Sequence, residues 1–167
     1  VRLAVANVNS TVGAMRSNVD RCIELGRRAE AEGATLVAYP EQVICGYAPE
    51  DLVQWRAFVS SQWDELLRFA DATKTGGAAH VLGLTVARGS HVYNAAALVH
   101  RGKVRGLVPK EKLPTYNVFY EARTFARGKA GLWDEVHGVP FGDLVFEISE
   151  KESIRDFARS SLAAPAT

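Results

Sequence analysis

The stretch HVLGLTVARGSHVYNAAALVHRGKVRGLV, residues 80–108, decides the fold of this chain. It contains three apolar segments, 80–87, 92–99 and 104–108, with a glycine in each intervening turn. Strand-like segments joined by turns this short pair in antiparallel fashion. The stretch therefore predicts a three-stranded antiparallel meander.

Two strand–helix pairs precede this meander. The segments 1–8 (VRLAVANV) and 35–39 (TLVAY) are predicted strands, and the second has the apolar character of a buried parallel strand. Ser17 to Asp20 is a weak capping box for the first helix, and Pro49 with Glu50 and Asp51 marks the start of the second. Together with the meander, this order predicts an α/β fold with a mixed sheet. The expected core faces are Val19, Cys22, Ile23, Gly26 and Ala29 in the first helix, and Leu52, Trp55, Val59, Trp63, Leu66 and Ala70 in the second.

A long loop follows the meander, with the sequence VPKEKLPTYNVFYEARTFARG at 108–128. Its apolar residues argue for an ordered loop that holds a lysine in place. These expected anchors are Leu113, Tyr116, Phe119, Tyr120 and Phe125. Residues 138–148 are predicted to form one further strand. We expect one domain over residues 1–148, then a short helix capped by Ser149 and Glu152 or a frayed tail over residues 149–167.

Composition narrows the class of protein. The 167 residues suit about one domain, and 20 basic against 19 acidic side chains give a net charge of +1. We therefore expect neither a nucleic-acid nor a membrane-surface partner. No apolar run reaches the roughly 18 residues that a membrane helix needs. The two cysteines form no CxxC pair, which favours a reducing, cytoplasmic location.

Motifs for metals and cofactors are lacking in the sequence. His80, His91, His100 and His137 have no metal-ligand spacing, and three of the four are expected at the surface, at strand ends or turns. The glycines match no phosphate-binding loop. We expect no metal and no cofactor.

Three charged residues could support acid–base chemistry. Glu41 follows a predicted strand and a proline, where a partly desolvated carboxylate can act as a general base, although such acids are often only helix caps. Lys110 is either solvated or held as an oxyanion donor. Glu121 could orient Lys110 through an ion pair, or could form a weak surface salt bridge.

The segments 39–47 (YPEQVICGY), 91–104 (HVYNAAALVHRGKV) and 109–128 together resemble the nitrilase superfamily of carbon–nitrogen hydrolases. The patterns PE-x4-GY-x2-EDL and K-x2-LPTY-x2-FYE-x-R-x-F-x2-G narrow the resemblance. They are similar to the amino-terminal glutaminase domains of glutamine-dependent NAD synthetases. The resemblance covers residues 1 to about 147.

This resemblance implies one half of an α-β-β-α sandwich, with the C-terminal part of the family fold missing. It also implies hydrolysis of the glutamine amide by a Glu-Lys-Cys triad, with ammonia passed to a synthetase domain. Glu41 would be the general base, Lys110 the oxyanion donor, Glu121 the supporting acid and Tyr116 part of the glutamine pocket. The family forms oligomers through its helical layers, so a homo-oligomer is expected.

The family's nucleophilic cysteine is absent, because the sequence has no cysteine after Cys45. Either Phe146 replaces it, or the segment 139–146 precedes the cysteine strand and the chain stops before it; we favour the second alignment. Cys45 lies four residues after Glu41 but would approach from the side of the base, so it is a remote candidate nucleophile.

Three functions stay open at this stage. The favoured one is a glutaminase-type domain that is inactive alone. The alternatives are a non-catalytic binding or assembly module, and a hydrolase of another small amide in which Glu41 activates water.

Overall fold

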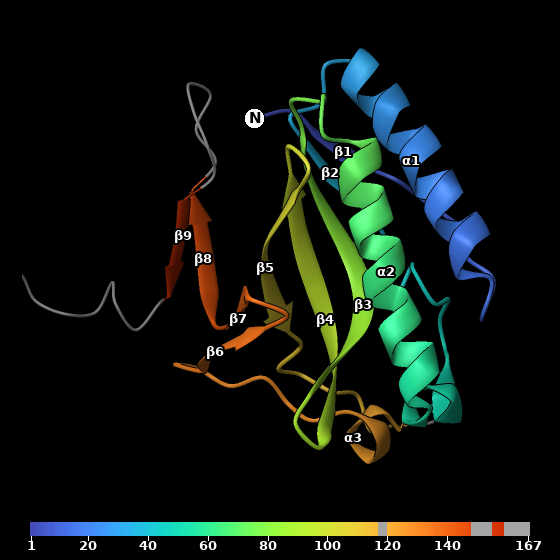
Figure 1. Ribbon diagram of the computed structural model, residues 1–167, viewed down its shortest axis with the longest axis vertical. Helices are drawn as coiled ribbons and strands as arrows, with labels where there is room; N and C mark the ends of the chain where they lie inside the picture. Colours follow the sequence, from blue (N-terminus) through green and yellow to red (C-terminus); the bar gives the residue numbers. More distant parts are fainter. Residues whose placement is uncertain (117–119, 148–154, 159–167) are drawn as a thin grey trace, which may run out of the picture.

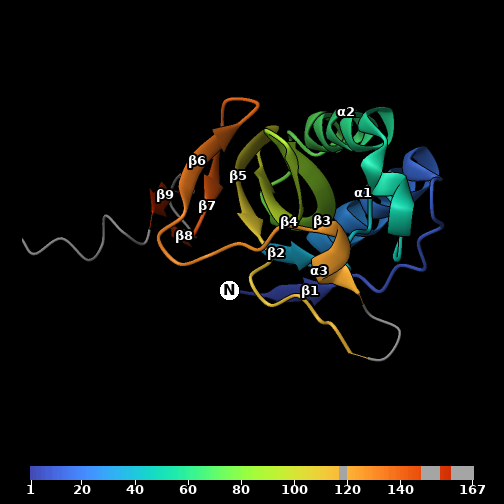
Figure 2. The same cartoon turned by 90° about the horizontal axis from the view of Figure 1, so that it is seen from below.

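The computed structural model describes residues 1–116, 120–147 and 155–158. Within them, seven strands form one sheet in the order β1-β2-β3-β4-β5-β7-β6 (Figures 1 and 2). The strands are β1 (Leu3–Val5), β2 (Leu36–Ala38), β3 (Ala79–Arg88), β4 (His91–His100), β5 (Lys103–Pro109), β6 (Trp133–Val136) and β7 (Val139–Gly142). β1, β2 and β3 are parallel, whereas β3, β4 and β5 form the predicted antiparallel meander. β7 joins β5 in parallel, so the prediction of a mixed sheet is confirmed.

The two long helices, α1 (Met15–Ala31) and α2 (Arg56–Ala72), lie side by side on one face of the sheet (Figure 1). A 3-10 helix, η1 (Glu50–Gln54), leads into α2, and a single turn, α3 (Glu121–Thr124), lies within the long loop. No helix of the described residues is long and apolar enough to cross a membrane. The main core lies between the helices and the sheet. Its fully buried members include Val19, Cys22, Val37, Leu66, Phe69, Leu82, Leu84, Leu107 and Phe141.

The first helix begins earlier than the sequence predicted. α1 starts at Met15, and the Ser17 hydroxyl donates to the Ala14 carbonyl instead of capping the helix N-terminus. The capping-box prediction is therefore wrong. The predicted apolar face is largely correct, because Val19 and Ile23 are buried along it.

The core face of the second helix also differs from the prediction. Trp55 lies between η1 and α2 with extended backbone, and its side chain is 67% exposed. Because the chain is extended at Trp55, this residue does not share the buried face of α2. Gln62 and Phe69 are buried on that face, although the sequence analysis did not include them in it.

Two of the four histidines, His80 and His100, are buried, so the expectation of three surface histidines is wrong. His80 is 1% and His100 is 8% exposed, because β3 and β4 lie in the interior of the sheet beneath the helices. His80 contacts Tyr39 and Phe69 and lies 3.3 Å from Glu30 Oε1. His91 and His137 are exposed.

The predicted strand at 138–148 is two strands in different sheets. Gly142, with φ +147°, separates β7 from β8 (Leu144–Glu147), and the next residue, Asp143, donates its N–H to the Leu132 carbonyl at 2.8 Å. β8 pairs in antiparallel fashion with β9 (Arg155–Ala158). The predicted tail helix is therefore wrong at 155–158. Ser149 and Glu152, its predicted cap, lie outside the described residues, as does Phe119.

Candidate active site

Glu41 follows β2 on a loop that crosses the sheet over Gly83 of β3. A Cβ atom on Gly83 would lie 2.7 Å from the Pro40 carbonyl oxygen and would also clash with the Gln42 nitrogen. Only glycine permits this close approach of two backbones. The crossing carries the Glu41 carboxylate over the middle of β3 towards Asn94 of β4.

Lys110 is the first residue after β5. Its N–H donates to the Asn94 carbonyl of β4 at 2.8 Å, and its own carbonyl accepts from the Gly128 N–H at 2.9 Å. These two bonds fix the main chain at the point where the sheet ends and the long loop returns. The lysine is therefore held from both sides.

The two carboxylates and the lysine meet in one cluster. Lys110 Nζ lies 2.7 Å from Glu41 Oε1, and 2.9 and 3.1 Å from Glu121 Oε2 and Oε1. Partial burial by itself lowers the pKa of Lys110, but the bonds to both carboxylates outweigh it and raise the pKa above its ordinary 10.5. Lys110 is thus held as an ammonium ion between two acids, and the predicted ion pair with Glu121 is present.

Glu121 is the buried member of this cluster, with 7% exposure. It begins α3, where its N–H donates to the Pro114 carbonyl. The Tyr47 hydroxyl donates to Glu121 Oε1 at 3.4 Å. Burial and the carboxylates of Glu121 and Glu41 raise the pKa of Tyr47, so this phenol stays protonated as a donor.

The loop that carries Lys110 and Glu121 has fewer apolar anchors than the sequence predicted. Leu113 and Phe125 are buried, and pack with Val53 and Val59. Tyr116 and Tyr120 are 64% and 67% exposed. The sequence pattern identified large apolar residues, but it could not show which of them pack against other side chains in the folded chain.

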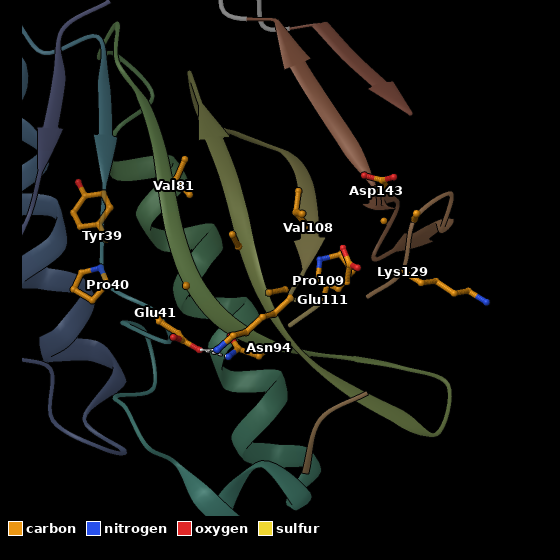
Figure 3. Close-up of a pocket in the computed structure, with 16 residues that line it drawn as sticks. Tyr39, Pro40, Glu41, Val81, Asn94, Val108, Pro109, Glu111, Lys129 and Asp143 are labelled. Carbon is orange, nitrogen blue, oxygen red and sulfur yellow. Dashed lines mark hydrogen bonds and ion pairs between the residues drawn. The ribbon is translucent and has the colours of Figure 1, made fainter. Parts of the chain in front are cut away.

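A cavity of about 470 Å³ opens beside Glu41, Lys110 and Asn94 (Figure 3). Its far wall carries Lys129 and Asp143, and Figure 3 shows Glu41 and Asn94 directed towards one another. The cavity thus joins an anionic base, a cation and an amide donor on one side to a second charged pair of residues on the other. The lining therefore offers both hydrogen-bond donors and acceptors to a polar group.

The sequence analysis did not identify four polar residues of this region: Asn94, Tyr47, Lys129 and Asp143. A signal existed for Asn94, which is the only polar residue inside the apolar segment 92–99. Its side chain is 3% exposed and its Nδ2 donates to Glu41 Oε1 at 2.5 Å. A buried amide in a strand needs a partner, and here the partner is the candidate base.

Tyr116 is 64% exposed and lines neither cavity near the cluster. The second of these cavities, of about 380 Å³, lies beside Glu121. Phe146 lies in β8 and packs against a small cluster formed by Ala79 and Leu98. It does not border the cavity either.

Cys45 is fully buried in the main core. Its Sγ lies 3.7 Å from the Gln42 carbonyl, and burial raises the pKa of the thiol to about 12. Cys22 is also a core residue, as predicted, and burial raises the pKa of its thiol to about 12. Neither sulfur borders the cavity, so the remote candidate nucleophile does not face the candidate base. Within the described ranges, no group of three or more histidine, cysteine or acidic residues could hold a metal ion.

Comparison with known proteins shows the family of this chain. The sequence model described as carbon-nitrogen hydrolase matches residues 2–160. The glutamine-dependent NAD(+) synthetase of Thermotoga maritima is 33% identical over 147 residues, covering 88% of this chain and 25% of that protein. The enzyme of the same name from Xanthomonas campestris is 40% identical over 126 residues, covering 75% of this chain and 22% of that protein.

A solved structure shows the same fold. The crystal structure of a glutamine-dependent NAD(+) synthetase from Cytophaga hutchinsonii superimposes with a TM-score of 0.83 at 25% identity. The match covers 90% of this chain and 26% of that one. The chain thus spans about a quarter of the length of the proteins that it resembles.

Proposed function

The chain belongs to the carbon–nitrogen hydrolase family, and on that premise we propose that it is a glutaminase-like domain whose cavity takes the side-chain carboxamide of glutamine. The relatives named above are glutamine-dependent NAD(+) synthetases, and their name is the reason for proposing glutamine as the substrate. Another small amide is the alternative substrate, because the cavity lining suits any carboxamide.

One observation carries the proposal: the Lys110 ammonium lies between Glu41 and Glu121 at the edge of the cavity. When a nucleophile adds to an amide, negative charge develops on the carbonyl oxygen, and a fixed ammonium stabilises it. Glu41 would take the proton from the attacking group and deliver it to the departing nitrogen. Glu121 would hold Lys110 charged and oriented.

We further propose that this chain forms no covalent intermediate by itself. Its only cysteines are Cys22 and Cys45, and both thiols are buried away from the cavity. A thiol with a pKa of about 12 carries almost no thiolate at neutral pH. The base and the oxyanion donor then bind and polarise an amide without the nucleophile of a Glu-Lys-Cys triad.

The test compares binding with chemistry in the folded chain. Glutamine should raise the thermal midpoint, because a ligand that binds only the native state stabilises it. Lys110→Met removes the ammonium and should abolish this rise in the thermal midpoint. The control Lys112→Met changes a side chain that is 90% exposed, and this variant should still be stabilised by glutamine. Intact mass after incubation with an electrophilic glutamine analogue should show no adduct.

Each arm can fail separately. A stoichiometric adduct on Cys45 that glutamine blocks would overturn the proposed lack of a nucleophile. Release of ammonia that thiol reagents do not affect would point instead to water activated by Glu41. If glutamine and other small amides give no protection, the cavity is not an amide site.

The partners are also proposals. Ammonia from the glutamine amide would serve a synthetase domain, as the names of the relatives suggest. The two free thiols suit a reducing compartment, and we propose the cytoplasm. We also propose a homo-oligomer, which size-exclusion chromatography with light scattering would test.

A further inference from the structure

Asn94 lies between Glu41 and Lys110, although an amide takes no part in proton transfer. It is a β4 residue with 3% exposure. It contacts both charged residues, which come from positions 53 residues before it and 16 residues after it. No other described residue is bonded to Glu41 by its side chain and to Lys110 by its main chain.

The main-chain bond sets the position of Lys110. The Asn94 carbonyl accepts the Lys110 N–H at 2.8 Å, directly after the register pair of Ala95 with Pro109. This bond is the last rung of the β4–β5 ladder and does not depend on the side chain at position 94. Substitution of Asn94 therefore leaves the lysine backbone in place and removes only the amide.

The side-chain bond sets the position of Glu41. The Glu41 side chain is 42% exposed, so its carboxylate would rotate freely unless held. Asn94 Nδ2 and Lys110 Nζ both donate to the same oxygen, Oε1, at 2.5 and 2.7 Å. No partner for Oε2 is found in the part of the chain that the structure describes. Two donors on one oxygen fix the plane of the carboxylate and leave the other oxygen to receive a proton.

We propose that Asn94 is a positioning residue for Glu41. Its amide and the Lys110 ammonium together hold Oε1 of Glu41, which leaves Oε2 as the proton-accepting oxygen. A catalytic role for Oε2 rests on the proposed function, but the positioning of the Glu41 carboxylate by Asn94 does not. Without the amide, Lys110 is the one described donor left on a Glu41 side chain that is 42% exposed. We then expect the carboxylate to turn towards solvent and Lys110 to keep Glu121 as its ordered partner. A lysine with one carboxylate partner is less firmly held as an ammonium ion than a lysine with two.

The test measures the reactivity of Lys110 in the ligand-free protein. A limiting amount of an N-hydroxysuccinimide ester acylates only unprotonated amines, and peptide mapping by mass spectrometry gives the ratio of labelling at Lys110 to that at Lys112. Lys112 is 90% exposed and serves as an internal reference. We expect the ratio to rise at least threefold in Asn94→Ala.

A matched control separates positioning from general destabilisation. Asn18 is also a buried asparagine, 4% exposed, and within the described ranges its amide bonds to backbone atoms alone, those of Thr11 and Ile44. Asn18→Ala should lower the thermal midpoint but leave the labelling ratio unchanged. If Asn94→Ala does not fold, Asn94→Leu retains the side-chain volume without the donor, and the same threefold rise is expected.

A labelling ratio that is unchanged or lower in the Asn94 variants would overturn the proposal, as would an equal rise in Asn18→Ala. Glutamine protection is measured in the same proteins to keep the two proposals apart. If wild-type protein shows no protection but the ratio rises in Asn94→Ala, the positioning stands and the glutaminase proposal fails. If both hold, the variant should bind glutamine about tenfold more weakly.

Discussion

The Lys110 ammonium lies 2.9 Å from Glu121 Oε2, and this pair holds α3 against the end of β5. The carboxylate is the more deeply buried partner, with 7% of its side chain exposed against 29% for the lysine. A carboxylate so enclosed depends on its counter-ion, because removing one partner leaves an uncompensated buried charge. The cluster that we propose for amide recognition is therefore also structural.

Replacement of Lys110 by methionine should lower the free energy of unfolding by about 2–3 kcal/mol, since the Glu121 carboxylate would lose its charged donor. Urea denaturation at pH 7 measures the change. Lys112→Met is the matched control. Among the described residues Lys112 pairs with the exposed Glu111 alone, so its loss should change stability by less than about 0.5 kcal/mol. Equal stability of the two variants would contradict a structural role for the pair.

Stability should also fall at alkaline pH through Lys110. The folded chain holds this lysine with a pKa above its ordinary 10.5, whereas the unfolded chain does not. The contribution is therefore fully present below pH 10.5 and is lost as the pH rises through the folded-state pKa. Between pH 9 and 12, wild-type protein should lose more stability than Lys110→Met. Parallel curves for the two proteins would refute this linkage.

Gly83→Ala should disturb the loop that carries Glu41. The added methyl group would collide with the backbone of Pro40 and Gln42, which cannot move without shifting the candidate base. We expect a loss of about 1–3 kcal/mol of stability and loss of glutamine protection. Gly77→Ala is the control, because a Cβ there meets no atom within 4 Å. A Gly83→Ala protein that melts like wild type and still binds glutamine would show that the loop tolerates a wider crossing.

His80 should make the fold sensitive to acid. Burial lowers the pKa of His80 below 6.5, although Glu30 opposes this effect. The other groups around it are Tyr39 after β2 and His100 on β4. Because the unfolded chain takes up a proton at this histidine more readily, stability should be lost as the pH falls below 6.5.

The measurement is the free energy of unfolding at pH 7 and pH 5. His80→Gln, which cannot titrate, should lose less stability over this interval than wild-type protein. His91→Gln changes an exposed histidine and should behave as wild type. A wild-type slope that survives in His80→Gln would assign the acid sensitivity to another group, such as His100.

Several parts of the site were predictable because they depend on local sequence. Lys110 follows directly after an apolar strand, and Glu41 follows another after Tyr39 and Pro40. The ends of parallel strands meet at one edge of a sheet. The patterns shared with the nitrilase superfamily then suggested roles for these residues. Those roles, and the role of Tyr116, remain predictions.

Other features could not be read from the sequence because they depend on packing partners distant along the chain. Trp55 and Leu66 both fit an apolar helical period, yet only Leu66 is covered, because the backbone break before α2 turns the tryptophan out. His80 has the residue type of a surface position, but its strand lies in the middle of the sheet, under two helices.

The sequence alone determined the meander, the mixed sheet and the absence of a cysteine after Cys45. These are matters of residue order and of alternation along single segments, which short-range sterics and apolar burial largely govern. Only the tertiary structure decided that Lys110 lies between two carboxylates, that Asn94 bonds to Glu41, and that Cys45 faces the core. Such contacts join residues up to 69 positions apart, and their geometry exists only once the sheet has brought the strand ends together.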